Sequence, residues 1–189
     1  LIKGQKLLFF SDCTCNIEPS AKQLAAITMN TVEFARTYSN ERPSVAMLSF
    51  TNFGSSKNSV SQTVADAVEL IKQKDPELEI DGEMQVDIAL QSDLRAKEFP
   101  FCGLKSDPNI LIFPNLASAN ISYKLLSNYS EVTAIGPILT GINFPANVLQ
   151  RTAKISEIVN MIYLTAHQSM PKGSQGALNQ FKSHFFQRN

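Results

Sequence analysis

Short apolar runs alternate along this chain with longer segments whose apolar residues recur at helical spacing. The apolar runs, each short enough for a strand of a buried sheet, are residues 6–10, 44–50, 78–80, 109–113 and 132–139. Helices are predicted over residues 20–37, 59–74, 117–129 and 155–166, with one or two short helical turns within 85–97. This alternation predicts an α/β fold, a three-layer α/β/α sandwich with a mostly parallel sheet and right-handed crossovers.

Two of the predicted helices begin with the spacing of a capping box. Ser20 is followed three residues later by Gln23, and Ser59 by Gln62. In a capping box the hydroxyl and the Gln side chain satisfy backbone N–H groups at the helix start. Both pairs therefore predict where a helix begins.

Composition excludes several classes of partner. The 189 residues carry 17 basic and 17 acidic side chains, so no basic field favours nucleic acid. No apolar run approaches the roughly 20 residues that span a bilayer, so we expect no membrane partner. The chain has three cysteines, an odd and small number that does not suggest a disulfide framework. We therefore expect a reducing, cytoplasmic location. Cys13 and Cys15 lack a second Cys/His pair at zinc spacing, so no metal site is expected.

Small and polar residues follow the strand predicted over 44–50. They are Ser49, Thr51, Asn52, Gly54 and Ser55. Backbone N–H groups, hydroxyls and the start of the next helix can cradle an anion at such a place. The alternative is an ordinary strand-to-helix turn, which favours the same residue types.

Two further strand ends are polar. Asp81 and Glu83 flank a glycine and can act as acid and base or hold a cation; alternatively, Asp81 caps the next turn and Glu83 faces water. Asn115 and Asn120 flank a helix start and can bond a ligand, although an N-cap role explains at least one of them. In an open parallel sheet these ends meet at one edge, which predicts one ligand-binding crevice.

Several blocks in the same order resemble the phosphate acetyl/butyryltransferase family. They are D-G-E-M-Q-V-D at 81–87, I-F-P-N-L-A-S-A-N-I-S-Y-K at 112–124, and A-I-G-P-I-L-T-G at 134–141. The resemblance implies the two-lobed fold of that family, within the isocitrate/isopropylmalate dehydrogenase-like superfamily.

Details of these blocks resemble one branch, the C-terminal domain of bacterial NADP-dependent malic enzymes. They are the Asn-Phe of S-F-T-N-F-G-S, Met84 and Asn115. In that branch the domain follows an oxidoreductase part that decarboxylates malate to pyruvate, and it is thought to bind acetyl-CoA and regulate. The resemblance therefore implies acetyl-CoA as an effector and no cofactor in this segment, with NADP and a divalent metal confined to the malic-enzyme part.

The family's G-L-x-K-P-x-N-D-L-S-R-G segment reads G-I-N-F-P-A-N-V-L-Q-R-T here, at 141–152. The resemblance assigns Arg151 to a phosphate or a CoA pyrophosphate, which a guanidinium can bind with two bonds. Gln150 replaces the serine that assists acyl transfer, and Phe144 and Val148 replace a lysine and an aspartate. Glu157 stands at the position of the family's active-site aspartate. Gln150 cannot manage a proton, so binding without turnover is favoured.

The family's chain order predicts how the sequence divides. Residues 1–133 would form the second lobe, 134–168 a return segment of the first lobe, and 169–189 a tail with a helix carrying Leu178, Phe181 and Phe185. Since the chain begins at Leu1 inside a strand-like run, we expect a piece of a longer polypeptide whose missing N-terminal malic-enzyme part is a partner. Apolar surface on residues 132–139 and 155–166 then predicts self-association.

Three functions therefore remain open. The first is a non-catalytic regulatory and assembly domain of an NADP-dependent malic enzyme. The second is an active phosphate acetyltransferase that moves an acetyl group between CoA and phosphate. The third is a dimerisation module whose cleft binds nothing.

Overall fold

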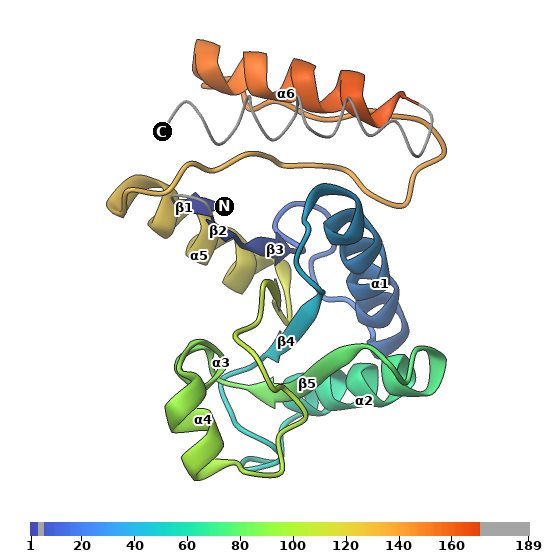
Figure 1. Cartoon of the computed structure of the whole chain (residues 1–189), viewed down its shortest axis with the longest axis vertical. Coiled ribbons are helices and arrows are strands. Elements are labelled where there is room, and N and C mark those ends of the chain that lie inside the picture. Colours follow the sequence, from blue (N-terminus) through green and yellow to red (C-terminus); the bar gives the residue numbers. More distant parts are fainter. Residues whose placement is uncertain (4–5, 171–189) are drawn as a thin grey trace. The chain divides into compact units, whose positions relative to one another are not determined.

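The computed structural model describes residues 1–3 and 6–170 and divides the chain into two compact units (Figure 1). One unit is Leu8–Tyr129, and the other combines Leu1–Leu7 with the residues from Ser130 onward. The helix predicted around Leu178, Phe181 and Phe185 lies outside the described residues. The division predicted at residue 133 stays a prediction.

A four-stranded parallel sheet forms the centre of unit Leu8–Tyr129. Its strands, in spatial order, are β3 (Phe9–Ser11), β6 (Ile110–Ile112), β4 (Ser44–Leu48) and β5 (Glu79–Met84). Each neighbouring pair is parallel, with Val45 of β4 opposite both Ile80 and Ile110. The predicted α/β class and largely parallel sheet are confirmed.

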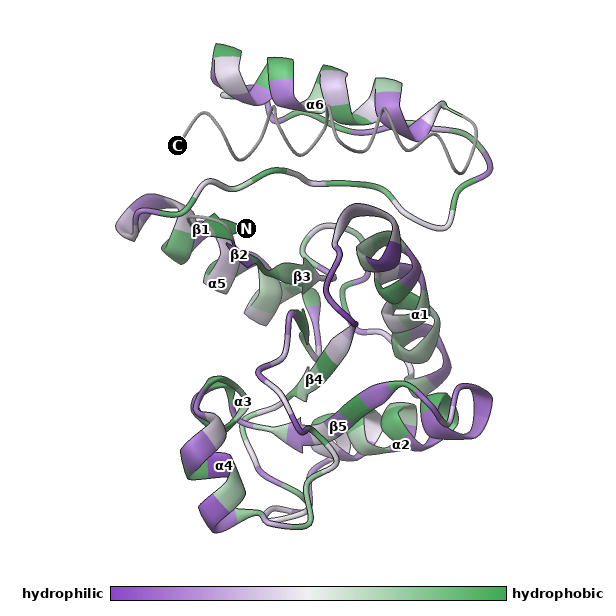
Figure 2. Cartoon of the chain, in the orientation of Figure 1, coloured by the Kyte–Doolittle hydropathy of each residue, from purple (hydrophilic) through white to green (hydrophobic). Residues whose placement is uncertain are grey.

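Helices cover both faces of this sheet, as Figure 1 shows. Val45 and Met47 pack with α1 (Ala21–Tyr38) and α2 (Ser59–Lys74), while Ala46 and Leu48 face the opposite layer. The opposite layer comprises α3 (Val86–Leu90), α4 (Ser92–Glu98) and α5 (Leu116–Tyr129). β4 is therefore buried on both sides, which explains the apolar run that follows Ser44, and most of β4 is coloured as hydrophobic in Figure 2.

The helix starts agree with the sequence at one site and differ at another. Ser20 and Gln23 form the predicted capping box of α1. The box predicted at Ser59 is wrong, because Asn58 is the N-cap and its side chain accepts a hydrogen bond from Val60 N at 2.9 Å. An Asn at the N-cap satisfies an orphan N–H group as a Ser would, so α2 starts one residue earlier than a cap at Ser59 implies.

The unit built from Leu1–Leu7 and the residues from Ser130 onward has less regular structure. β1 (Ile2–Lys3) pairs antiparallel with β2 (Lys6–Leu7), and α6 (Ile155–Gln168) is its long helix. The predicted first strand, residues 6–10, is thus two strands, β2 and β3, which belong to different units.

The strand predicted over residues 132–139 is wrong. Thr133 makes an isolated antiparallel bridge to Ile2, and the described residues from 134 to 139 form no strand. Gly136, with φ +146°, and Pro137, which has no N–H to donate, interrupt the run. The apolar character of residues 132–139 was therefore not sufficient to predict a strand.

The helix predicted over 155–166 has an apolar stripe, formed by the four residues named next, and this stripe lies on the exposed side of α6. Ile155, Ile158, Val159 and Ile162 are 81%, 36%, 41% and 63% exposed, whereas Met161 and Leu164 are buried. Self-association through this stripe stays a prediction.

Candidate functional site

The polar strand ends of unit Leu8–Tyr129 lie at one edge of its sheet. Because all four strands are parallel, their carboxyl ends point the same way. The residues that follow them directly are Asp12, Ser49, Gln85 and Phe113, with Asn115 two residues further on. Open α/β sheets bind ligands at this edge, so these loops are the candidate site.

A buried carboxylate organises the loop after β4. Glu83 is 3% exposed, and its Oε1 accepts hydrogen bonds from Thr51 Oγ1 at 3.0 Å and from Gly54 N at 2.6 Å. The backbone carbonyl of Glu83 also accepts a bond from Phe53 N at 2.8 Å. The interpretation that Glu83 faces water is therefore wrong, because groups of the loop replace the water.

A second link joins the same loop to the end of β5. Asn52 Oδ1 accepts from Gln85 N at 2.7 Å, and Asn52 Nδ2 donates to Gln85 Oε1 at 2.8 Å. Gln85 Nε2 in turn donates to Phe50 O at 2.9 Å. The hydroxyl, amide and N–H groups predicted to bind a ligand at Thr51, Asn52 and Gly54 are thus engaged within the protein.

Ser49 and Phe53 differ from their neighbours in this loop. Ser49 Oγ is buried and has no hydrogen-bond partner among the described residues. Phe53 has φ +46°, a left-handed conformation that costs free energy for a bulky residue. Its ring lies 5.1 Å from the rings of both Phe99 and Phe101, which hold it in place.

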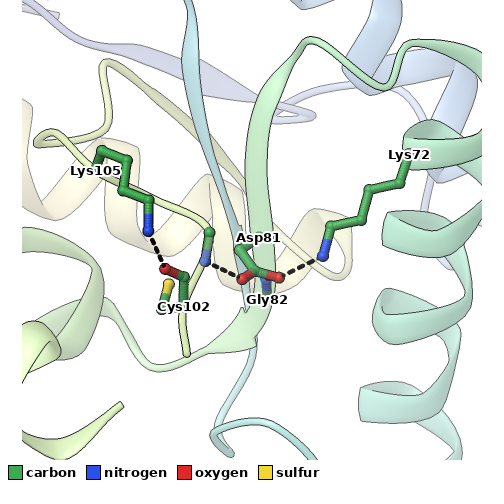
Figure 3. Close-up of polar contacts among 6 residues, drawn as sticks. Lys72, Asp81, Gly82, Cys102 and Lys105 are labelled. Carbon is green, nitrogen blue, oxygen red and sulfur yellow. Dashed lines mark hydrogen bonds and ion pairs between the residues drawn. The ribbon is translucent and has the colours of Figure 1, made fainter. Parts of the chain in front are cut away.

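Asp81 ties β5 to two other segments, as Figure 3 shows. Its carboxylate is within 2.9 Å of Lys72 Nζ on α2 and accepts Gly103 N at 2.6 Å. Lys105 Nζ reaches Cys102 O at 3.4 Å beside it. The interpretation that Asp81 caps the next turn is wrong, and both carboxylates of this pair are engaged in structural bonds rather than open to acid–base work.

The β3 and β6 ends form a separate cluster at the same edge. Asp12 accepts bonds from the backbone of Thr14, Cys15 and Asn16. Burial raises the pKa of Asp12, but these bonds and that of the Asn16 side chain outweigh it and lower the pKa below its ordinary 3.8. Asp12 is therefore a loop-forming anion rather than a proton donor.

Asn115 and Asn120 also have partners within this cluster. Asn115 Oδ1 accepts Ser118 N at 2.9 Å, which confirms its N-cap role at α5, and Asn120 Nδ2 donates to Cys13 O at 3.2 Å. Ligand binding by either residue stays a prediction.

The remaining candidates, Gln150, Arg151 and Glu157, belong to the other unit. All three are exposed, and Glu157 Oε2 accepts Lys154 N at 2.9 Å at the start of α6. Glu157 thus acts as a helix-capping residue here. The structure brings Thr51, Asn52 and Gly54 together through Glu83 and Gln85, and it places Gln150 and Arg151 in a different unit from them.

Sequence reasoning missed three structural roles. Gln85 and buried Glu83 anchor the loop after β4, and Asn147 anchors the extended segment before Gln150. Asn147 Oδ1 accepts Leu139 N at 3.0 Å, and its Nδ2 donates to Thr165 Oγ1 at 2.9 Å and Gln168 Oε1 at 2.7 Å. For Glu83 and Gln85 the available signal was the D-G-E-M-Q block, where polar residues continue directly from an apolar run.

The described residues also bear on metal and membrane binding. Within residues 1–3 and 6–170, no group of three or more His, Cys, Asp or Glu side chains is arranged to hold a metal ion. None of the helices in this same part of the chain combines the length and apolar character needed to cross a bilayer.

Comparisons with known proteins give a consistent result. The chain is 38% identical over 170 residues to a phosphate acetyltransferase of Bacillus subtilis, covering 90% of this chain and 52% of that protein. It is 41% identical over 163 residues to the phosphate acetyltransferase of Clostridium acetobutylicum, covering 86% and 49%. It is also 43% identical over 157 residues to the NADP-dependent malic enzyme of Escherichia coli, covering 82% and 21%. The chain thus spans about half the length of the phosphate acetyltransferases it matches.

Solved structures and a family profile agree with these relatives. The EutD phosphotransacetylase from Staphylococcus aureus matches with a TM-score of 0.82 and 36% identity, over 89% of this chain and 52% of that chain. A phosphotransacetylase from Streptococcus pyogenes matches with a TM-score of 0.79 and 38% identity, over 85% and 48%. The profile for phosphate acetyl/butaryl transferases matches residues 1–166. The chain therefore belongs to the phosphate acetyl/butaryl transferase family.

Proposed function

We propose that this chain is part of a phosphate acetyltransferase, which moves an acetyl group between CoA and phosphate. The observation that carries the proposal is the set of relatives named above, which match 86–90% of this chain and bear that name. They support the second of the three hypotheses better than the first. In a protein of that kind the chain corresponds to about half of the molecule.

The chemistry can be assigned to residues of this chain as follows. The CoA sulfur attacks the acetyl carbonyl of acetyl phosphate, a C–S bond forms, the C–O bond to phosphate breaks, and the thiol proton ends on the departing phosphate. The exposed guanidinium of Arg151 binds the phosphate oxygens with two parallel bonds. Ser49, Ser55, Asn115 and Asn120 are proposed to contact the ligand. Thr51, Asn52 and Gly54, which bond to Glu83 and Gln85, are proposed to hold the loop that carries Ser49 and Ser55.

A second candidate function is favoured by the segment that carries Arg151. Gln150 has no titrating group, and Phe144 and Val148 provide neither the lysine nor the aspartate of the family pattern. A domain of this kind would bind acetyl-CoA and regulate an NADP-dependent malic enzyme without acyl transfer. NADP and a divalent metal would then bind only in the malic-enzyme part.

An assay of acetyl-CoA formation from acetyl phosphate and CoA, on the full-length protein, separates the two functions. If the protein is a phosphate acetyltransferase, we expect turnover that Arg151→Ala lowers about 100-fold. Lys74→Ala, which removes an exposed cation on α2, should have no effect. Calorimetric binding of acetyl-CoA without turnover would favour the regulatory domain. No turnover and no heat with acetyl-CoA would favour the dimerisation module.

A further inference from the structure

We propose that Glu83 is a positioning residue that sets the loop of residues 49–58 for binding a phosphate group. The inference rests on the proposed function only in naming phosphate as the group bound. The positioning step itself concerns contacts within unit Leu8–Tyr129.

The first step of the argument is the burial of Glu83. A carboxylate that is 3% exposed has lost its water and must be compensated by donors from the protein. Its partners, Thr51 Oγ1 and Gly54 N, both come from the loop. The free energy of burying this charge therefore depends on the loop keeping its conformation.

The second step is the strain within the loop. Phe53, between the two donors, has φ +46°, which bulky residues avoid. Such a conformation persists only where the surroundings over-determine it. Here Phe53 N donates to the Glu83 carbonyl at 2.8 Å, and the ring packs with Phe99 and Phe101. Glu83 thus holds the loop through both its main chain and its side chain.

The third step is what this arrangement leaves for a ligand. Thr51, Asn52 and Gly54 are engaged with Glu83 and Gln85, whereas Ser49 Oγ is buried without a partner in the described part of the chain. Ser49 begins the loop at the carboxyl end of β4, and its N–H bonds Met84 O at 2.9 Å. A buried hydroxyl without a partner is costly unless a bound group completes it. We assign it to an oxygen of the phosphate group, which the buried hydroxyl can meet only after rotating about χ1.

Glu79 provides a matched control on the same strand. Its Oε1 accepts hydrogen bonds from Lys105 N, Ser106 N, Ser106 Oγ and Ser44 Oγ, all within 3.0 Å. It therefore anchors a loop much as Glu83 does, but the loop at residues 105–106 contains no candidate ligand-binding residue. Loss of Glu79 should cost stability without changing phosphate binding.

The experiment compares four variants of the full-length protein. Glu83→Met removes the acceptor while keeping the length of the side chain, and Glu83→Gln keeps a carbonyl oxygen for the same two donors. Thr51→Val removes one of the two donors to the Glu83 carboxylate, and it replaces Glu83→Met as the test if that variant fails to fold. Glu79→Met is the control. Binding of inorganic phosphate and of CoA is measured separately by calorimetry, and hydrogen exchange reports on residues 49–58.

We expect Glu83→Met to weaken phosphate binding about tenfold, corresponding to about 1.4 kcal/mol, and to speed exchange in residues 49–58. Thr51→Val should weaken it by about threefold, and Glu83→Gln should restore binding to within about threefold of the wild type. Glu79→Met should leave binding unchanged while lowering the melting temperature. If only CoA binding responds, the loop recognises a phosphate of CoA rather than free phosphate.

Two results would overturn the inference. One is faster exchange in residues 49–58 of Glu83→Met with unchanged binding of both ligands, which would mean a purely structural role. The other is a wild-type protein that binds neither phosphate nor CoA. Absence of acetyl transfer alone, with binding that depends on Glu83, would reject the proposed function and leave the positioning role intact.

Discussion

The loops at the sheet edge and the segment carrying Gln150 and Arg151 are anchored in different ways. Polar side chains in or next to the strands hold the former: Glu83 and Gln85 hold the loop after β4, and Asp12 holds the loop after β3. The side chain of a single residue, Asn147, links the latter to Leu139, Thr165 and Gln168. The difference shows that polar residues at strand ends can have their hydrogen bonds taken up by the protein itself. The side chain of Arg151, in contrast, is exposed to solvent.

The largest expected effect tests how closely β5 packs on β4. In Gly82→Ala the new Cβ would clash with the backbone oxygen of Met47, and φ +145° is unfavourable for alanine. We expect a loss of about 4 kcal/mol or more in the free energy of unfolding, measured by urea denaturation. Gly141→Ala, at φ +75° on the exposed segment, should cost only about 1–2 kcal/mol. Equal losses of stability in Gly82→Ala and Gly141→Ala would contradict the inference that β5 packs more closely than the segment around Gly141.

A second test concerns the apolar residues of the two units. Leu111→Ala in β6, fully buried, should cost about 2–5 kcal/mol because it leaves a cavity in the sheet core. Ile162→Ala, at a side chain that is 63% exposed, should change stability by less than about 0.5 kcal/mol. A large loss at Ile162, growing with protein concentration in light scattering and denaturation, would instead support self-association through α6.

A third test removes the side chain that anchors the segment before Gln150. Asn147→Ala leaves Leu139 N, Thr165 Oγ1 and Gln168 Oε1 without this partner. We expect a loss of about 1–3 kcal/mol and faster hydrogen exchange in residues 137–150. Exchange in residues 49–58 should not change, and a change there would show that the two regions are coupled.

The smallest expected effect is a pH dependence of stability. Burial raises the pKa of Glu79, but bonds from Ser106, Lys105 and Ser44 outweigh it and lower the pKa below its ordinary 4.5. Since the folded pKa lies below the unfolded one, the stabilisation is complete above pH 4.5 and is lost as pH falls through the folded pKa. Glu79→Gln should flatten acid unfolding curves in that range, and an unchanged curve would contradict this.

The sequence predicted the layers of the fold better than its polar contacts. Helical spacing and apolar runs identified the order of β4, α2 and β5, because residues with these spacings lie on the faces that are buried in the core. The strand over 78–80 extends to Met84 because Asp81 and Glu83 find backbone donors, which depends on distant residues such as Gly103 and Gly54. The hydrophobicity of a residue does not show whether its side chain finds a distant hydrogen-bond donor. The prediction therefore ended the strand at residue 80, before these acidic residues.

The candidate site shows the same limit. The sequence predicted that polar residues such as Ser49 and Asn115 lie at one edge of the sheet, because the carboxyl ends of parallel strands point the same way. It did not identify Gln85 as part of this edge. Which polar groups are already satisfied depends on side-chain pairing across 30 or more residues, as between Asn52 and Gln85. Only the three-dimensional arrangement distinguishes Ser49 Oγ, which lacks a partner among residues 1–3 and 6–170, from Thr51 Oγ1, which has one.

The position of β5 at the border of the sheet has one more consequence. A border strand offers unpaired backbone groups on which another polypeptide can add, a common start of aggregation. Glu79, Asp81 and Glu83 bind neighbouring loops that leave Asp81 and Glu83 only 7% and 3% exposed, so β5 is a poor template for such growth. Neutralising all three acids together should therefore cause fibrillar or amorphous association even under conditions where the sheet itself survives.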